Sequence, residues 1–373
     1  MRKKDKTWII CSAEGYIKRG YETYTRELVD NLNKDYPSSS LLVRAAVKNN
    51  YDKNTLNIFN LLGLNSKLNN FLSKRIKKFH PHQAYFLHLI GFMACLFPLI
   101  FFIRPKTIYV VEGTLYKYLF YFKKYIYKNL KLIYFTGGQL IKTLPVNERI
   151  FLHHVTPCYK DTALKMGFSK DKQFLIPHFT NTNPFSYHNA AQLKNELGIN
   201  TNALIVLSVG SIDYSVKRMD YVIEEFAKIK REKFLILLGH QTKETHDIIN
   251  KAQLLLTENE YAILTVSKDK VDQYYQLADI VVSASKNEGF GLMYIEALAN
   301  KKIPIVHDFP VARYVLDKYA IFRDLSLAGE LSNAIENYDS LIHKMNLDSL
   351  AQFMNERYAW QNQSGLYYKF ILN

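Results

Sequence analysis

The chain has 373 residues, of which 48% are hydrophobic and 22% charged, and its formal net charge is +15. This length is sufficient for two domains with separate cores, and the hydrophobic content excludes an intrinsically disordered chain. Three widely separated cysteines, Cys11, Cys95 and Cys158, form no CxxC pair. They therefore exclude a disulfide framework and a cysteine zinc site, and they favour a reducing compartment. The apolar run after the basic N-terminus is too short for a secretory signal, so we expect a first strand there and a cytoplasmic protein.

The positive charge is concentrated in the first half of the chain. Residues 1–185 contain 29 lysines and arginines against 11 acidic residues, whereas residues 186–373 contain 20 against 23. This asymmetry predicts that the first half faces an anionic partner, such as a membrane surface or a phosphorylated acceptor. A nucleic-acid partner is disfavoured because the sequence contains no recognisable nucleic-acid-binding motif. A lysine-rich source proteome is the simpler alternative, but it would not explain the acidic second half.

Strands alternate with helices in both halves. In the first half, we expect a helix at 20–34 and strands at 7–13, 40–47, 107–113 and 131–138. In the second half, we expect strands at 203–211, 234–240, 261–267, 279–285 and 302–308, with helices at 220–230, 245–256, 270–278 and 292–300. Such alternation predicts two doubly wound α/β domains with parallel sheets. Pro177, Pro184 and the polar residues around them interrupt the pattern, so we expect the linker at 184–192.

Two segments of the first half suggest contact with a membrane. Residues 84–103 contain no charge over 20 residues, which meets the length criterion for a transmembrane helix, but His88 and Pro98 argue against a span. A buried helix and an interfacial helix remain as alternatives. Residues 116–131 interleave lysines with tyrosines and phenylalanines on a predicted helix, a pattern typical of a membrane interface. Four basic residues precede the uncharged segment, Lys74, Arg75, Lys77 and Lys78, and the second segment contains Lys117, Lys123, Lys124, Lys128 and Lys131.

The segment SASKNEGFGLMYIEALANKKIPIV, residues 283–306, carries the clearest chemical signal. Gly289 and Gly291 allow a ligand to approach the backbone, and the helix that we expect to start at Leu292 would present unpaired N–H groups. Such a helix start favours a phosphate or diphosphate. Glu296 would lie about one turn into the helix, where its carboxylate can accept hydrogen bonds from both hydroxyls of a ribose. Glu288, in the loop, could reach the group attached beyond the diphosphate.

The same residues are compatible with two alternatives to a nucleotide site. Paired glutamates also occur in glycosidases, but hydrolysis of a simple glycoside needs no anion-binding loop. An ordinary strand–turn–helix connection would also contain glycines. A second glycine loop, in residues 206–229, places Lys217 and Arg218 ahead of another predicted helix, where they could meet the same diphosphate. The two loops together favour the nucleotide site.

Several motifs together resemble the retaining glycosyltransferases of family 4, also called group 1, which have the GT-B fold. NEGFGLMYIEALA resembles the family's signature of two glutamates separated by seven residues, and VGSIDYSVKRMDYVIEEF resembles its phosphate loop. Further similarities are GYETYTRELVDNL, VTPCYKDTALKMG and YAWQNQSGLYYKFIL. The resemblance implies two Rossmann-like domains facing across a cleft. Residues 1–187 would bind the acceptor, residues 188–354 would bind the nucleotide sugar, and a final helix at 355–373 would return to the N-terminal domain.

The resemblance also implies a role for each residue of the donor site. Lys217 would bind the donor diphosphate together with backbone N–H groups of residues 290–292, and Glu296 would hold the ribose. Glu288 would contact the transferred sugar, which makes Glu288 and Lys217 the catalytic candidates. The donor-binding candidates are Gly20, Gly210, Ser211, Lys217, Arg218, Gly289, Phe290, Gly291, Leu292 and Glu296.

Three positions depart from the family pattern. Ser211 stands where the family often has an arginine, and Arg218 stands where a glycine is common, so we expect Arg218 to compensate for Ser211. The TGGQ segment at 136–139 lacks a histidine that often contacts the sugar in the family. These departures leave the identity of the donor open.

The implied reaction is glycosyl transfer with retention, without a metal or other cofactor. Positive groups and helix dipoles would stabilise the leaving diphosphate. By family frequency we expect a UDP-sugar donor, and from the basic first half a lipid-linked or cell-envelope glycan acceptor at the inner face of the cytoplasmic membrane. A catalytically inactive GT-B subunit that binds a partner, or a protein or anionic-polymer acceptor, is the alternative. His153, His154 and His178 are expected to be loop or surface residues rather than metal ligands.

Overall fold

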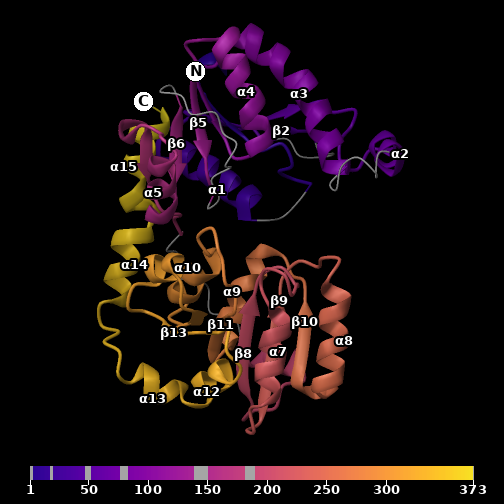
Figure 1. Cartoon of the computed structure of the whole chain (residues 1–373), viewed down its shortest axis with the longest axis vertical. Coiled ribbons are helices and arrows are strands. Elements are labelled where there is room, and N and C mark those ends of the chain that lie inside the picture. Colours follow the sequence, from indigo (N-terminus) through magenta and orange to yellow (C-terminus); the bar gives the residue numbers. More distant parts are fainter. Residues whose placement is uncertain are drawn as a thin grey trace. The chain divides into compact units, whose positions relative to one another are not determined.

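The computed structural model divides into two compact units and describes residues 3–16, 20–46, 52–75, 83–137, 150–180 and 190–372. Unit 1 comprises Met1–His178 and Gln363–Asn373, and unit 2 comprises Phe179–Asn362. Each unit is a parallel sheet with helices packed against it (Figure 1). Most of the expected linker, residues 181–189, lies outside the described residues, as do Lys77, Lys78 and the last two residues of the TGGQ segment.

Unit 1 contains a seven-stranded sheet in the order β3-β2-β1-β4-β5-β6-β7, with every neighbouring pair parallel. The chain therefore crosses over between β1 and β4, as expected for a doubly wound sheet. The strands are β1 (Thr7–Ile10), β2 (Ser40–Ala45), β3 (Thr55–Ile58), β4 (Thr107–Val110), β5 (Lys131–Phe135), β6 (Phe151–His154) and β7 (Gln173–Leu175). The helices are α1 (Gly20–Asp35), α2 (Lys67–Arg75), α3 (Gln83–Ile103), α4 (Gly113–Tyr125) and α5 (Pro157–Lys165).

Successive residues of the unit 1 strands serve opposite faces of the sheet. Trp8 and Ile10 pack in a core formed with α3, α4 and α5. On the other face, Tyr109 of β4 shares a hydrogen bond of 3.1 Å with Tyr24 of α1. The fully apolar strand pattern predicted from the sequence follows from this burial on both faces.

The C-terminal segment completes the α1 side of unit 1. The helix α15 (Trp360–Tyr367) is followed by a π-turn at Tyr368–Leu372. Lys131 donates a hydrogen bond of 2.7 Å from its Nζ to the Phe370 carbonyl, and the Phe370 ring stacks on Phe174 at 3.8 Å. The return to unit 1 begins at Gln363 rather than near residue 355, because the preceding helix α14 (Leu350–Tyr358) packs on α10 in unit 2. The division after His178 likewise differs from the expected 187/188 boundary.

Unit 2 contains a six-stranded parallel sheet in the order β10-β9-β8-β11-β12-β13, with its crossover between β8 and β11. Helix α7 contacts α8 and α12, whereas α9 contacts α6 and α10. The strands are β8 (Leu204–Val209), β9 (Lys233–Leu238), β10 (Tyr261–Leu264), β11 (Ile280–Ser283), β12 (Ile305–His307) and β13 (Ile321–Arg323). The helices before α14 are α6 (Ala190–Glu196), α7 (Met219–Ala227), α8 (Thr245–Leu255), α9 (Lys268–Leu277), α10 (Leu292–Ala299), α11 (Pro310–Leu316), α12 (Glu330–Glu336) and α13 (Tyr338–Ile342).

The uncharged segment forms α3, which is the one helix within the described ranges long and apolar enough to cross a membrane. The stripe of α3 that packs in the unit 1 core comprises His88, Leu89, Phe92, Met93, Leu96 and Ile100. Other side chains of α3, including Phe101 and Phe102, are exposed. One face of α3 is therefore a core face, and the interfacial alternative concerns only the rest of its surface.

Candidate functional site

Two loops of unit 2 follow adjacent parallel strands at the crossover of the sheet. The first loop leaves β8 at Gly210, and the second leaves β11 and reaches α10. Because parallel strands end at the same edge, the crossover is where ligands bind in open α/β sheets. The sequence-predicted glycine loops therefore meet at the position where the fold favours a ligand.

Lys217 and Glu288 form an ion pair between these two loops. Lys217 Nζ donates to Glu288 Oε1, and the two side chains are only 18% and 11% exposed. A Cβ atom on Gly210 would lie 2.6 Å from Lys217 Cε, so the lysine stem occupies space that only glycine leaves. The structure thus brings together three of the predicted residues: Lys217 from the loop after β8, Glu288 from the loop after β11, and Gly210, which leaves room for the lysine.

Asp213 fixes the course of the loop that presents Lys217. Its Oδ1 accepts the backbone N–H groups of Val216 at 3.0 Å and Lys217 at 2.6 Å. Ser211, a donor-binding candidate, donates its hydroxyl to the other oxygen of Asp213. Ser211 therefore supports the loop through Asp213. Sequence reasoning missed Asp213, although an aspartate that bonds backbone N–H groups a few residues ahead is typical of a turn.

Glu244 supports the tip of the same loop. Its Oε2 accepts the backbone N–H groups of Tyr214 and Ser215, both at 3.1 Å. Glu244 immediately precedes α8, 29 and 30 residues further along the chain than its two partners. No local sequence signal could have assigned it to this loop.

Arg218 supports the backbone of the site. Its φ of +53° places it in the left-handed region, which explains why glycine suits this position. Its Nη1 donates to the carbonyls of Ala284, at 3.2 Å, and Leu325, at 2.7 Å, and its guanidinium lies over the Tyr221 ring. Arg218 thus joins the start of α7 to the exit of β11. Its predicted contact with the diphosphate, in compensation for Ser211, remains a prediction.

The second loop ends at Gly291, the residue before α10. Gly291 has a φ of +82°, and a Cβ there would lie 2.4 Å from the Tyr294 ring, so glycine is required for both conformation and space. Phe290 is buried and packs edge-to-face on Tyr358 at 6.0 Å. The N–H groups of Leu292 and Met293, at the start of α10, have no partner within the helix, whereas that of Tyr294 donates to the Gly291 carbonyl at 2.8 Å. This end of α10 is suited to an anion.

Glu296 lies on α10 one turn after its start. Its Oε2 accepts a hydrogen bond of 3.1 Å from the hydroxyl of Tyr275, which is completely buried. Burial, followed by the charge of Glu296, raises the pKa of Tyr275 well above its usual value, so Tyr275 remains a donor at neutral pH. Tyr275 therefore orients the carboxylate of Glu296, the residue predicted to hold the ribose. The periodicity of α9 did not reveal this role of Tyr275.

Two further donor-binding candidates are the glycines Gly289 and Gly20. Gly289 lies half-buried between Glu288 and Phe290 in the second loop. Gly20 belongs to unit 1, where it is the exposed first residue of α1. Its approach to the donor phosphates remains a prediction.

The expectation that the three histidines are loop or surface residues is wrong for His153 and His154, which belong to β6 and are buried, whereas His178 lies in the loop after β7 and is also buried. Tyr109 donates to His153 Nδ1 at 2.8 Å, and His153 Nε2 donates to the Ile176 carbonyl at 2.8 Å. Burial lowers the pKa of His153 to about 3 and that of His154 to about 4. His153 and His154 are therefore neutral core residues of unit 1. Within the described ranges, no three His, Cys, Asp or Glu side chains gather as a potential metal site.

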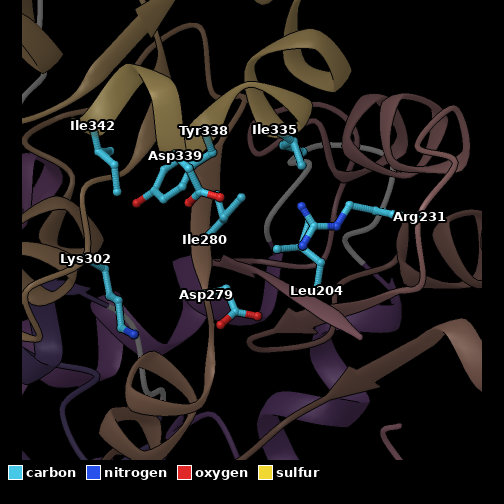
Figure 2. Close-up of a pocket in the computed structure, with 9 residues that line it drawn as sticks. All are labelled: Leu204, Arg231, Asp279, Ile280, Lys302, Ile335, Tyr338, Asp339 and Ile342. Carbon is cyan, nitrogen blue, oxygen red and sulfur yellow. The ribbon is translucent and has the colours of Figure 1, made fainter. Parts of the chain in front are cut away.

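A cavity of about 240 Å³ lies elsewhere in unit 2 (Figure 2). It is lined by the first residues of β8 and β11, by Arg231 and Lys302, and by residues of α12 and α13. These strands begin at the cavity and end at the two loops. The cavity is therefore at the opposite edge of the sheet from Lys217 and Glu288 and is not part of the candidate site.

Comparison with known proteins agrees with this geometry. Residues 189–345 match the family model described as glycosyl transferases group 1. Unit 2 is a group 1 glycosyltransferase domain. The resemblance stated from the motifs is thereby confirmed at the level of the group, and family 4 in particular stays a prediction.

The sequence is 26% identical over 190 residues to alpha-monoglucosyldiacylglycerol synthase of Streptococcus pneumoniae, covering 43% of this chain and 43% of that relative. The chain thus matches less than half the length of this relative.

Solved structures establish the fold of the whole chain. Sucrose-phosphate synthase from Thermosynechococcus elongatus superposes with a TM-score of 0.79 at 16% identity, covering 98% of each chain. HepE of Anabaena, solved in complex with UDP-glucose, superposes with a TM-score of 0.71 at 14% identity, covering 96% of this chain and 97% of that one. These likenesses confirm the predicted GT-B fold class.

Proposed function

We propose that the protein is a retaining glycosyltransferase that moves a sugar from a nucleotide-diphosphate donor, a UDP-sugar, to a lipid-linked or cell-envelope glycan acceptor. The observation that carries the proposal is the Lys217–Glu288 pair at the crossover of a group 1 domain, beside the start of α10. The complex of HepE with UDP-glucose supports the choice of UDP.

The residues of unit 2 suit the charge changes of such a transfer. The bond between the anomeric carbon and the diphosphate breaks, and a bond to the acceptor oxygen forms on the same face of the sugar while the acceptor hydroxyl loses its proton. Negative charge moves to the diphosphate, where Lys217 and the first turn of α10 would stabilise it. Glu288 would face the anomeric carbon as it gains positive charge. We propose that these groups supply the stabilisation without a metal or other cofactor.

The acceptor proposal rests on an exposed surface of unit 1, here called the α3–α4 surface. Rings at the end of α3 and along α4 are exposed, and Phe102 is 80% exposed. The two helices form one continuous surface there. Phe97 of α3 stacks on Phe122 of α4 at 5.3 Å, and Arg104 lies over both Phe101 and Tyr127. The exposed members of the surface are Phe101, Phe102, Tyr118, Tyr121, Lys124, Tyr125, Ile126 and Lys128.

Two of the lysines expected to face lipid serve the interior of unit 1. Lys123 is buried and donates to the carbonyls of Leu130 and Lys128, and Lys131 donates to Phe370. Exposed aromatic rings with lysines among them are typical of a peripheral membrane contact. We therefore propose peripheral attachment to the inner face of the cytoplasmic membrane. The similarity to alpha-monoglucosyldiacylglycerol synthase supports a glycolipid acceptor.

A transfer assay tests the proposal. Purified protein is incubated with UDP-glucose and other UDP-sugars in the presence of diacylglycerol-containing vesicles, and glycolipid product and released UDP are measured. We expect product with wild-type protein and loss of at least about 100-fold with Lys217→Ala. Lys270→Ala, an exposed lysine on α9, is the matched control. UDP binding without transfer or hydrolysis of any sugar would instead support the inactive partner-binding alternative.

Vesicle flotation tests the membrane part separately. We expect binding to vesicles with anionic lipid at low salt, weaker binding at high salt, and loss when Lys124 and Lys128 are changed to glutamine. Protein that stays in the soluble fraction under every condition would contradict the membrane proposal and favour a protein or anionic-polymer acceptor.

A further inference from the structure

The outer face of α3 is apolar along most of its length. Its exposed residues recur every three or four positions, at Ile90, Ala94, Pro98 and Phe101, and Phe102 follows at the end. This spacing places them on one stripe, opposite the stripe that packs in the unit 1 core. The helix contains no lysine, arginine, aspartate or glutamate. A solvent-facing stripe without charge is typical of a surface that another partner covers.

The helix α2 and the segment before it extend this stripe at the N-terminal end of α3. The two helices pack together (Figure 1). Asn69 of α2 donates from its Nδ2 to the Leu62 carbonyl at 2.6 Å and to the Ala84 carbonyl at 2.8 Å. A Cβ on Gly91 would lie 2.3 Å from Asn60 Oδ1, so this segment lies directly against α3. The exposed apolar residues here, called the α2–α3 surface, are Phe59, Leu61, Leu68, Phe71, Ile90, Ala94 and Pro98.

Residues 59–131, which include this surface, are almost purely basic. They contain 12 lysines and arginines and one acidic residue, Glu112. That carboxylate accepts hydrogen bonds from Ser12 and Tyr85 and so serves the interior of unit 1. A second copy of the chain would bring two such basic faces together, which disfavours a dimer through the α2–α3 surface. An anionic lipid leaflet offers both an apolar boundary and the opposite charge.

Exposed arginines lie over exposed rings near both ends of α3. Arg75 lies 4.2 Å from the centre of the Phe71 ring, and Arg104 lies 5.8 Å from that of Phe101. Cations among aromatic rings suit the depth of lipid headgroups. Because the opposite stripe of α3 packs in the unit 1 core, the helix can lie along a bilayer interface without crossing it.

We propose that the α2–α3 surface inserts into the boundary between headgroups and acyl chains of an anionic leaflet, with α3 in the plane of the membrane. This inference rests on the proposed membrane attachment and extends it from the α3–α4 surface to a second surface that buries apolar area. Salt screens the attraction of lysines to lipid but does not weaken apolar burial. Part of the vesicle binding should therefore resist high salt and depend on the α2–α3 surface.

A new tryptophan can report insertion directly, because the two tryptophans of the chain, Trp8 and Trp360, are buried. Ile90→Trp places the reporter on the α2–α3 surface. Leu254→Trp, at an exposed position of α8 in unit 2, is the matched control. Both are measured with vesicles of phosphatidylglycerol and phosphatidylcholine, with and without bromine on the acyl chains. We expect brominated lipid to quench the added emission of Ile90→Trp and to leave that of Leu254→Trp unchanged.

The contribution to binding is measured by flotation at high salt. Phe71→Ala should lower the partition into these vesicles about tenfold, because a ring that would be buried in the interface is lost. Leu254→Ala should leave the partition unchanged. Phe71 is exposed, so its variant should melt at the wild-type temperature, which separates lost insertion from lost folding.

The outcomes separate this inference from the proposed attachment. Wild-type protein that floats with vesicles while neither tryptophan is quenched would overturn the inference and leave the attachment intact. Equal quenching at both positions would overturn it as well, since the contact would not be specific to the α2–α3 surface. Wild-type protein that stays soluble contradicts both. A dimer in ultracentrifugation that Ile90→Asp dissociates would assign the surface to a second copy instead.

Discussion

The two units have the same topology at their crossovers, yet these positions contain different chemistry. In unit 2, Glu288 follows β11 and is paired with Lys217 in a partly exposed site. In unit 1, Glu112 follows β4 and accepts hydrogen bonds from the Ser12 N–H at 2.9 Å and the Tyr85 hydroxyl at 2.6 Å. Its burial raises its pKa. A carboxylate after a crossover strand therefore marks a ligand site only where a ligand can still compete for its partners.

The two units also differ in their numbers of basic and acidic residues. Unit 1 has 30 lysines and arginines against 11 acidic residues, whereas unit 2 has 19 against 23. Some of the unit 1 charge is structural: the fully buried Arg44 pairs with Glu14, which also pairs with Arg26 at 3.0 Å. The surplus that faces outward includes Lys124 and Lys128 on the α3–α4 surface. Net charge alone does not distinguish basic residues in internal ion pairs from basic residues that face outward.

The largest effect is expected from neutralising the two crossover carboxylates in turn. Under the proposed function, Glu288→Gln should lower the rate of transfer by about 100-fold or more, because it removes the negative group proposed to face the anomeric carbon. Glu112→Gln should leave transfer within about threefold, because its contacts are internal to unit 1. Steady-state kinetics with the best UDP-sugar provides the measurement. Equal losses in both variants would show that the comparison is wrong.

A large effect on stability is expected from the buried cation of unit 1. Arg44→Met should lower the free energy of unfolding by about 3 kcal/mol, because a buried ion pair loses one partner. Lys217→Met should lower it by about 1 kcal/mol or less, because that pair keeps contact with solvent. Urea unfolding of both variants tests this. A larger loss for Lys217→Met would mean that the unit 2 pair is mainly structural.

Two carboxylates, Glu112 of unit 1 and Glu225 of unit 2, should give opposite dependences of stability on pH. The pKa of Glu112 is raised, so its contribution is present below about pH 4.5 and is lost as pH rises through its folded value. For Glu225 in unit 2, burial is outweighed by hydrogen bonds from Lys228, Gly329 and Ser332, which hold its pKa below the usual value. Its contribution is present above about pH 4.5 and is lost as pH falls through its folded value.

The measurement compares unfolding free energies from pH 3 to 7, a range of about two units on either side of the usual value. Glu112→Gln should flatten the decline with rising pH, and Glu225→Gln should destabilise most at the neutral end. Parallel pH profiles for the two variants would contradict the assigned directions.

The smallest effect is expected from single surface lysines. Lys124→Gln in unit 1 should weaken binding to anionic vesicles about fivefold at low salt, since one basic residue near such a surface contributes about 1 kcal/mol. Lys270→Gln in unit 2 should leave vesicle binding unchanged. Cosedimentation at two salt concentrations measures both. Equal sensitivity of the two variants would locate the membrane contact outside the α3–α4 surface.

In unit 2 the sequence predicted strands β8 to β12 and helices α7 to α10, but not helices α6, α11, α12 and α13; unit 1 was predicted less completely. The strands β3, β6, β7 and β13 were not predicted, because each has three or four residues and periodicity over so few positions is weak. The histidines of β6 looked polar and therefore exposed, but partners inside the core satisfy their hydrogen bonds. Tyr109 and the Ile176 carbonyl bond to His153, and the side chains of Thr136 and Gln173 bond to His154.

The sequence by itself determined the alternation of strands and helices, the glycines that admit Lys217 and the turn before α10, and the spacing of Glu288 and Glu296. These are local properties, since periodicity, glycine placement and helix starts depend on neighbouring residues. The tertiary structure decided which side chains these residues meet. Glu244 and Tyr275 reach the site, and Lys123 becomes internal, through contacts that depend on how the segments fold against one another. Such contacts are set by packing and burial, which a one-dimensional pattern does not record.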